Sequence, residues 1–85
     1  MDEQKYRKVY IDVITEMRRD GTVIPLRFVW EDDRRYKIDR VRHITPAASL
    51  KVGGRGMRYT VVINGQERYF FREDDRWFVE APALN

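Results

Sequence analysis

The sequence predicts an all-β fold, a small, strongly bent antiparallel sheet or barrel of five to six strands in meander order. Apolar and polar residues alternate along most of the chain, as in strands with one buried face. Two turn signals, Asp20-Gly21 and Asn64-Gly65, separate alternating segments. No segment has the spacing of a long amphipathic helix. Short strands joined by tight turns favour a curved sheet or a barrel.

The first two strands form the first predicted hairpin. Alternation from Val9 to Met17 indicates a half-buried strand, and Asp20-Gly21 supplies the turn. In the second strand, residues 22–30, the even-numbered apolar residues are expected on one face, namely Ile24, Leu26, Phe28 and Trp30. Pro25 cannot donate a ladder hydrogen bond, which places this segment at a sheet edge or a bulge.

The third predicted strand, residues 35–44, changes phase in its middle. Tyr36 and Ile38 share one face, whereas Val41 falls on the other. A change of one residue indicates a β-bulge near Asp39-Arg40, which would increase the curvature of the sheet.

The alternation stops over TPAASLKVGGRG, residues 45–56, which reads as a connection. It can open with one short helical turn in which Thr45 caps and Pro46 takes the first helical position. Three further strands are expected after it, over residues 57–63, 66–71 and 76–81. Adjacent aromatic residues in the last two strands suggest that both faces of the sheet are at least partly covered.

The tetrapeptide E-D-D-R occurs twice, at residues 31–34 and 73–76, each time between aromatic residues. Paired carboxylates of this kind suit acid–base or metal chemistry only where they converge in a desolvated cleft. Aspartate is also favoured in tight turns, because it bonds nearby backbone N–H groups and tolerates left-handed conformations. Since hairpin tips point into water, we interpret both segments as turns.

Composition argues for one domain over residues 1–85, with an ordered β core of about residues 8–80, and against an enzyme. The chain has no cysteine and a single histidine, His43, so we expect no metal site and no cofactor. No nucleophile with a base and an orienting group is evident. The N-terminal residues lack the apolar core of a signal peptide, and no run approaches membrane-spanning length. A cytoplasmic protein is the expectation.

Positive charge is concentrated in the middle of the chain. Between Arg40 and Gln66 there is no acidic residue. We interpret this segment as a candidate nucleic-acid-binding surface for single- or double-stranded partners, with Tyr36 or Tyr59 stacking on bases. Its candidate residues are Arg40, Arg42, Lys51, Arg55, Arg58 and Tyr59.

Two alternatives accompany this hypothesis. The glycine-rich segment around Lys51 and Arg55 is more simply explained as a plain strand connection, and a protein contact is a further alternative. The aromatic residues are needed as core in so small a domain. The competing function is therefore a protein-interaction or oligomerisation module, which binds a partner protein or a second copy through an open strand edge or an aromatic face.

The order of several short motifs resembles a family of small bacterial β domains. The motifs are P-L-R-F-V-W at residues 25–30, R-Y-K-I at 35–38, R-Y-T-V at 58–61 and D-R-W-F-V-E at 75–80. Some of these domains occur at the C-terminus of, or beside, Y-family polymerase-like proteins of translesion repair. The resemblance implies a β fold and a role as an accessory of DNA repair. It implies no catalytic residue, and the central segment, residues 47–57, departs from the family pattern.

Overall fold

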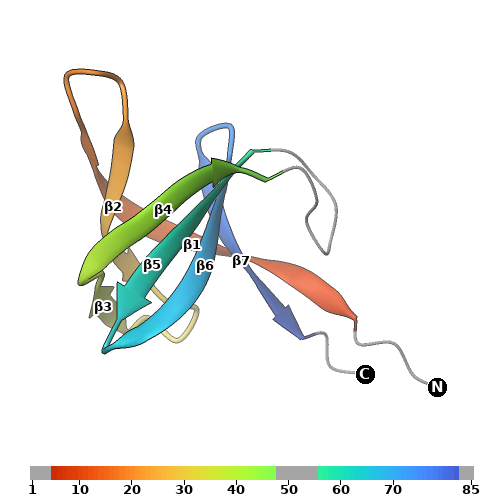
Figure 1. The fold of residues 1–85 in the computed structure, drawn as a ribbon. Helices are drawn as coiled ribbons and strands as arrows, with labels where there is room; N and C mark the ends of the chain where they lie inside the picture. The colour runs from red at the N-terminus through yellow and green to blue at the C-terminus, as the bar shows by residue number, and fades with distance from the viewer. Residues whose placement is uncertain (1–4, 48–55, 83–85) are drawn as a thin grey trace.

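The computed structural model describes residues 5–47 and 56–82, and this part of the chain forms one seven-stranded antiparallel sheet. The sheet curls into a half-barrel (Figure 1). The all-β prediction is confirmed, but the count of five to six strands is wrong. No helix able to cross a membrane is found among the described residues. The strands are β1 (Tyr6–Met17), β2 (Val23–Val29), β3 (Arg35–Lys37), β4 (Arg40–Pro46), β5 (Met57–Ile63), β6 (Gln66–Glu73) and β7 (Arg76–Pro82).

The seventh strand arises because the third predicted strand changes partner along its length. Its first part, β3, pairs with β2, and its second part, β4, pairs with β5. Between them the N–H of Ile38 donates to the Leu26 carbonyl (2.9 Å) and the N–H of Asp39 donates to the Val62 carbonyl (2.8 Å). The predicted bulge lies beyond this break, at Arg42, where the register of β4 against β5 shifts.

The strands follow the order β3-β2-β1-β7-β6-β5-β4. Strands that are consecutive in sequence are neighbours except at the β3–β4 break, so the predicted meander holds over most of the sheet. The one long-range pairing is that of β1, whose residues 6–11 pair with β7 and whose residues 12–17 pair with β2. Because the two halves of β1 have different partners, the sheet turns sharply along this strand.

The predicted inward face of β2 is wrong over its first half. The register between β1 and β2 shifts so that Leu26 is an extra residue, a bulge beside Pro25. The bulge that the sequence predicted from Pro25 is therefore present, and it reverses which side chains of β2 point inward. Val23 and Pro25 are buried instead of Ile24 and Leu26, while Phe28 is buried as expected.

Both two-residue turn signals form hairpins. Gly21 (φ 90°) lies in the turn between β1 and β2, and Thr22 N–H donates to the Asp20 carboxylate at 2.9 Å. That hydrogen bond is the main reason why the pKa of Asp20 lies below its ordinary value. Asn64 (φ 52°) and Gly65 (φ 76°) both adopt left-handed conformations between β5 and β6, as a type I′ turn requires.

The two E-D-D-R segments are turns, as predicted. Asp33 (φ 66°) and Asp74 (φ 55°) take the left-handed conformation that aspartate tolerates. Arg34 N–H donates to the Asp32 carboxylate at 3.0 Å, and the Asp75 side chain is 99% exposed. Among the described residues, no group of three or more His, Asp or Glu side chains is placed to hold a metal ion. These carboxylates shape the turns in water.

The expected helical turn after residue 44 is wrong. Thr45 and Pro46 continue β4, opposite Arg58 and Met57 of β5, and described residues 5–47 and 56–82 contain no helix. The ladder hydrogen bonds to β5 extend the strand through the positions that the sequence pattern assigned to a helix N-terminus.

Both faces of the sheet are partly covered, which confirms the expectation from the adjacent aromatic residues. Phe70 and Trp77 belong to the inner core cluster. Their neighbours Phe71 and Phe78 point to the opposite face because successive side chains on a strand alternate. There they stack on each other with ring centroids 5.3 Å apart and are nearly inaccessible to solvent.

Tyr59 is the polar member of the inner core. Its side chain is 2% exposed, and its hydroxyl donates to the Val23 carbonyl at 2.8 Å, which joins β5 to the start of β2. Burial raises the pKa of the Tyr59 hydroxyl above its ordinary value of 10.0, with Arg72 opposing the shift.

We expect Tyr59→Phe to lower the free energy of unfolding by about 1–3 kcal/mol, because the Val23 carbonyl loses its donor. Since the folded pKa of Tyr59 is raised, its contribution to stability is complete below pH 10 and is lost as pH rises through the folded value. The variant should therefore lose less stability than the wild type above pH 10. Urea unfolding as a function of pH measures both effects; exposed Tyr69→Phe is the control, and equal losses in the two variants would contradict the prediction.

Candidate functional site

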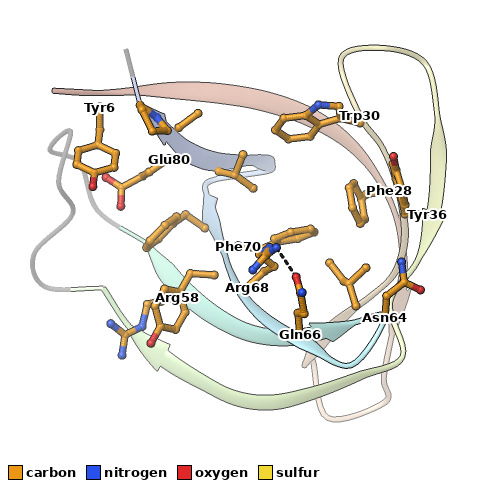
Figure 2. Close-up of a pocket in the computed structure, with 16 residues that line it drawn as sticks. Tyr6, Phe28, Trp30, Tyr36, Arg58, Asn64, Gln66, Arg68, Phe70 and Glu80 are labelled. Carbon is orange, nitrogen blue, oxygen red and sulfur yellow. Dashed lines mark hydrogen bonds between the residues drawn. The ribbon is translucent and has the colours of Figure 1, made fainter. Parts of the chain in front are cut away.

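A groove of about 630 Å³ opens on the concave side of the half-barrel (Figure 2). Figure 2 shows Trp30, Phe28 and Tyr36 along one side of it and Tyr6 and Glu80 across from them. Strand β6 runs between the two sides with Gln66, Arg68 and Phe70. Most of the lining is apolar, so the groove suits a ligand with both apolar and polar groups.

The groove exists because β6 and β7 separate. The two strands pair only at the ends next to their shared turn, from Glu73 opposite Arg76 to Phe71 opposite Phe78. Beyond that point β7 follows β1, whereas β6 follows β5, and the strands spread apart (Figure 1). On its β7 side, the edge of β6 over residues 66–70 has no partner strand in the described part of the chain. We call residues 66–70 the open edge.

The hairpins on both sides of β6 show which backbone groups point out from the open edge. Gln66 closes the two-residue hairpin with β5, so Gln66, Arg68 and Phe70 direct their N–H and C=O groups to β5. The intervening residues Glu67 and Tyr69 must direct theirs away from β5, to the side from which β7 has departed. An edge of this kind is a template for another strand.

One wall of the groove is aromatic and firmly packed. Phe28 stacks on Tyr36 at 5.2 Å between ring centroids and meets Phe70 edge-on at 4.9 Å. Phe28 and Phe70 are buried, while Trp30 and Tyr36 are partly exposed and face the groove. The buried rings pack against the exposed ones and fix their positions. The side chains of this wall therefore lose little conformational freedom when a ligand binds.

Two arginines with exposed side chains border the open edge. The Arg68 guanidinium donates to the Gln66 side-chain oxygen at 2.6 Å and to the Glu67 carbonyl at 3.3 Å. The Arg58 guanidinium lies over the Tyr69 ring, 4.8 Å from its centroid. Both arginines are therefore held in defined positions beside the groove.

The candidate nucleic-acid residues do not gather at this groove. Arg40 pairs with Val62, and Val62 and Arg58 are separated by an even number of positions on β5, so Arg40 and Arg58 lie on the same face of the sheet. They are at opposite ends of the β4–β5 pair. Arg42 forms an ion pair with Glu67 at 2.9 Å. Tyr59 is core, so its ring is not exposed for base stacking. Lys51 and Arg55 lie outside the described residues.

Sequence reasoning missed most of the groove. It identified Arg58 and Tyr36 as binding residues, but not Arg68 or Trp30. The pattern at residues 66–71 correctly predicted a strand, yet nothing local shows where a strand parts from its neighbour. The available signal was the polar run Gln66-Glu67-Arg68, which is unusual in a strand with partners on both sides.

Comparisons with known proteins do not assign this site. No family model matches the chain, and no curated protein or solved structure matches it either.

Proposed function

We propose that this protein is a non-enzymatic binding module that holds an extended peptide of a partner protein against the open edge of β6. The observation that carries the proposal is the separation of β6 from β7 beside an aromatic groove. Strand addition of this kind uses main-chain hydrogen bonds for affinity and side-chain pockets for specificity. The cytoplasm is the compartment in which we expect it to act.

The chemistry of the open edge supports a partner protein over uncontrolled self-association. Glu67 and Arg68 place charges on this edge, and charged edge residues are a common protection against pairing between identical copies. The N–H groups of Glu67 and Tyr69 and the Tyr69 carbonyl are available to a ligand strand, while the Glu67 carbonyl already accepts from Arg68; the aromatic wall offers apolar contacts next to them. A second copy of the chain is therefore the less favoured occupant.

Nucleic-acid binding, and with it an accessory role in DNA repair, receives less support. Of its candidate residues, Arg42 is offset by Glu67 and Tyr59 is buried, which leaves Arg40 and Arg58 within the described part of the chain. The resemblance to domains found beside translesion polymerases stays a prediction. It enters the experiment below as a competing outcome.

The test begins with peptides selected on the full chain from a random dodecapeptide phage library. The probe is a synthetic copy of the most enriched peptide, and the measurement is amide hydrogen exchange. In the free protein we expect fast exchange at Glu67 and Tyr69 and slow exchange at Arg68 and Phe70, whose amides bond to β5. At a peptide concentration tenfold above Kd, exchange at Glu67 and Tyr69 should slow by about tenfold.

A matched pair of variants isolates the main-chain contact. Tyr69→Pro removes an N–H that faces the open edge, whereas Tyr69→Ala removes the same ring but keeps the N–H. We expect the proline variant to bind the peptide about threefold to tenfold more weakly than the alanine variant, the value of one hydrogen bond. Equal affinities in two folded variants would contradict strand addition.

The competing functions give different results. Fluorescence anisotropy with labelled single- and double-stranded DNA, at about 50 and 200 mM salt, detects nucleic-acid binding by its steep salt dependence. If the protein binds DNA while the amides of Glu67 and Tyr69 keep exchanging fast, the ligand is a nucleic acid and not a peptide. Salt-tolerant self-association in light scattering, with those amides protected in the oligomer, would assign the open edge to a second copy. Enrichment of no peptide would overturn the proposal.

A further inference from the structure

The two arginines at the open edge, Arg68 of β6 and Arg58 of the neighbouring β5, lie on opposite faces of the sheet. Arg68 is opposite Val61, a core residue, so its side chain is on the groove side of the sheet. Tyr69 follows it and therefore faces the other side, where it carries the Arg58 guanidinium on its ring. A strand added beside residues 68 and 69 would present successive side chains to these same two faces.

Both guanidinium groups are positioned by contacts that leave hydrogen-bonding capacity. Arg68 uses Nη1 and Nη2 for the Glu67 carbonyl and the Gln66 side chain, and a guanidinium has five N–H donors. Arg58 is held by the face of Tyr69, a contact that occupies no N–H group. Each arginine can therefore take an acceptor from a ligand without losing its support.

The charges of these arginines are not neutralised by the described residues. Other arginines have carboxylate partners, such as Arg42 with Glu67 at 2.9 Å and Arg72 with Asp75 at 3.5 Å. Within residues 5–47 and 56–82, Arg58 and Arg68 form no ion pair with a carboxylate. Arg68 on the groove side, Arg58 at the rim on the outer side and one carboxylate, Glu80, line the groove, so the two positive charges favour an anionic ligand.

We propose that the ligand is an acidic peptide strand in which two adjacent residues carry carboxylates, one for Arg68 on the groove side and the next for Arg58 on the outer side. This inference rests on the proposed function. The fork of a guanidinium matches a carboxylate in a bidentate contact, and the aromatic wall then receives apolar residues of the same peptide.

The test compares the peptide selected above, if it carries adjacent acids, with a twin in which both carboxylates are amides. We expect the twin to bind about tenfold more weakly. Arg58→Gln and Arg68→Gln should each lower the affinity for the acidic peptide about threefold to tenfold, but should leave the affinity for the amide twin nearly unchanged. Arg19→Gln removes the same charge from the exposed β1–β2 turn and is the control.

The outcomes separate this inference from the proposed function. Selected peptides without adjacent acids that still protect the Glu67 and Tyr69 amides would overturn the acidic specificity and leave peptide binding intact. Equal losses of affinity for the acidic peptide in Arg58→Gln, Arg68→Gln and Arg19→Gln would show that only net charge matters. That result would also overturn the acidic specificity. If no peptide is selected, and DNA binding is instead lost in Arg58→Gln, both proposals are wrong and the arginines bind phosphates.

Discussion

Replacement of Phe78 by alanine is expected to lower the free energy of unfolding by about 3–5 kcal/mol. The Phe78 side chain is 0% exposed, and its ring stacks on Phe71 at 5.3 Å and meets Tyr10 edge-on at 5.7 Å. Lys8 places its ammonium 4.7 Å from the ring centroid on the same face. Truncation removes all of these contacts and opens a cavity between three strands.

The loss is large for a domain of this size. Natural domains unfold with about 5–15 kcal/mol in total, and an 85-residue chain lies towards the lower part of that range. Urea unfolding followed by tryptophan fluorescence gives the free energy for the wild type and the variant. Met17→Ala is the control, because Met17 is 73% exposed and its truncation should change stability by less than about 0.5 kcal/mol. A loss below about 1 kcal/mol for Phe78→Ala would contradict the packing of the outer face.

Replacement of Gly56 by alanine is expected to cost about 2–4 kcal/mol. Gly56 precedes β5 with φ at 140°, a conformation that side-chain-bearing residues rarely adopt. A Cβ at this position would also overlap the carbonyl oxygen of Arg72 on β6. Since that oxygen belongs to the backbone of a paired strand, relief requires β5 and β6 to move apart.

Gly21→Ala separates the two contributions. Gly21 also has a positive φ, 90°, but a Cβ there would meet no atom within 4 Å. It should therefore show only the conformational cost, about 1 kcal/mol. The same urea unfolding measurement compares the two variants, and similar losses would show that the close approach of Gly56 to β6 contributes nothing.

Features that depend on neighbouring residues were predictable from the sequence. The period-two alternation identified β1, β5, β6 and β7 as strands, because side chains on a strand alternate whatever its partner is. The hairpins at Asp20-Gly21 and Asn64-Gly65, and the interpretation of both E-D-D-R segments as turns, follow from the φ values that these residue types tolerate. Pro25 predicted a bulge for an equally local reason, its missing N–H group.

The errors occur where a distant strand decides the geometry. The bulge beside Pro25 reversed which residues of β2 face inward, and alternation alone cannot show where the phase is reset. The break at Ile38-Asp39 formed because the chain passes from β2 to β5, and Thr45 and Pro46 remained in a strand because β5 pairs with them.

By itself the sequence determined that this chain forms short antiparallel strands with polar turns and aromatic residues on both faces. Only the tertiary structure decided that β7 leaves β6 to follow β1, and thereby created the groove and the open edge of β6. The reason is physical: alternation and turn conformation are properties of a few consecutive residues, whereas the choice of partner strand is a competition between segments that are far apart in the chain.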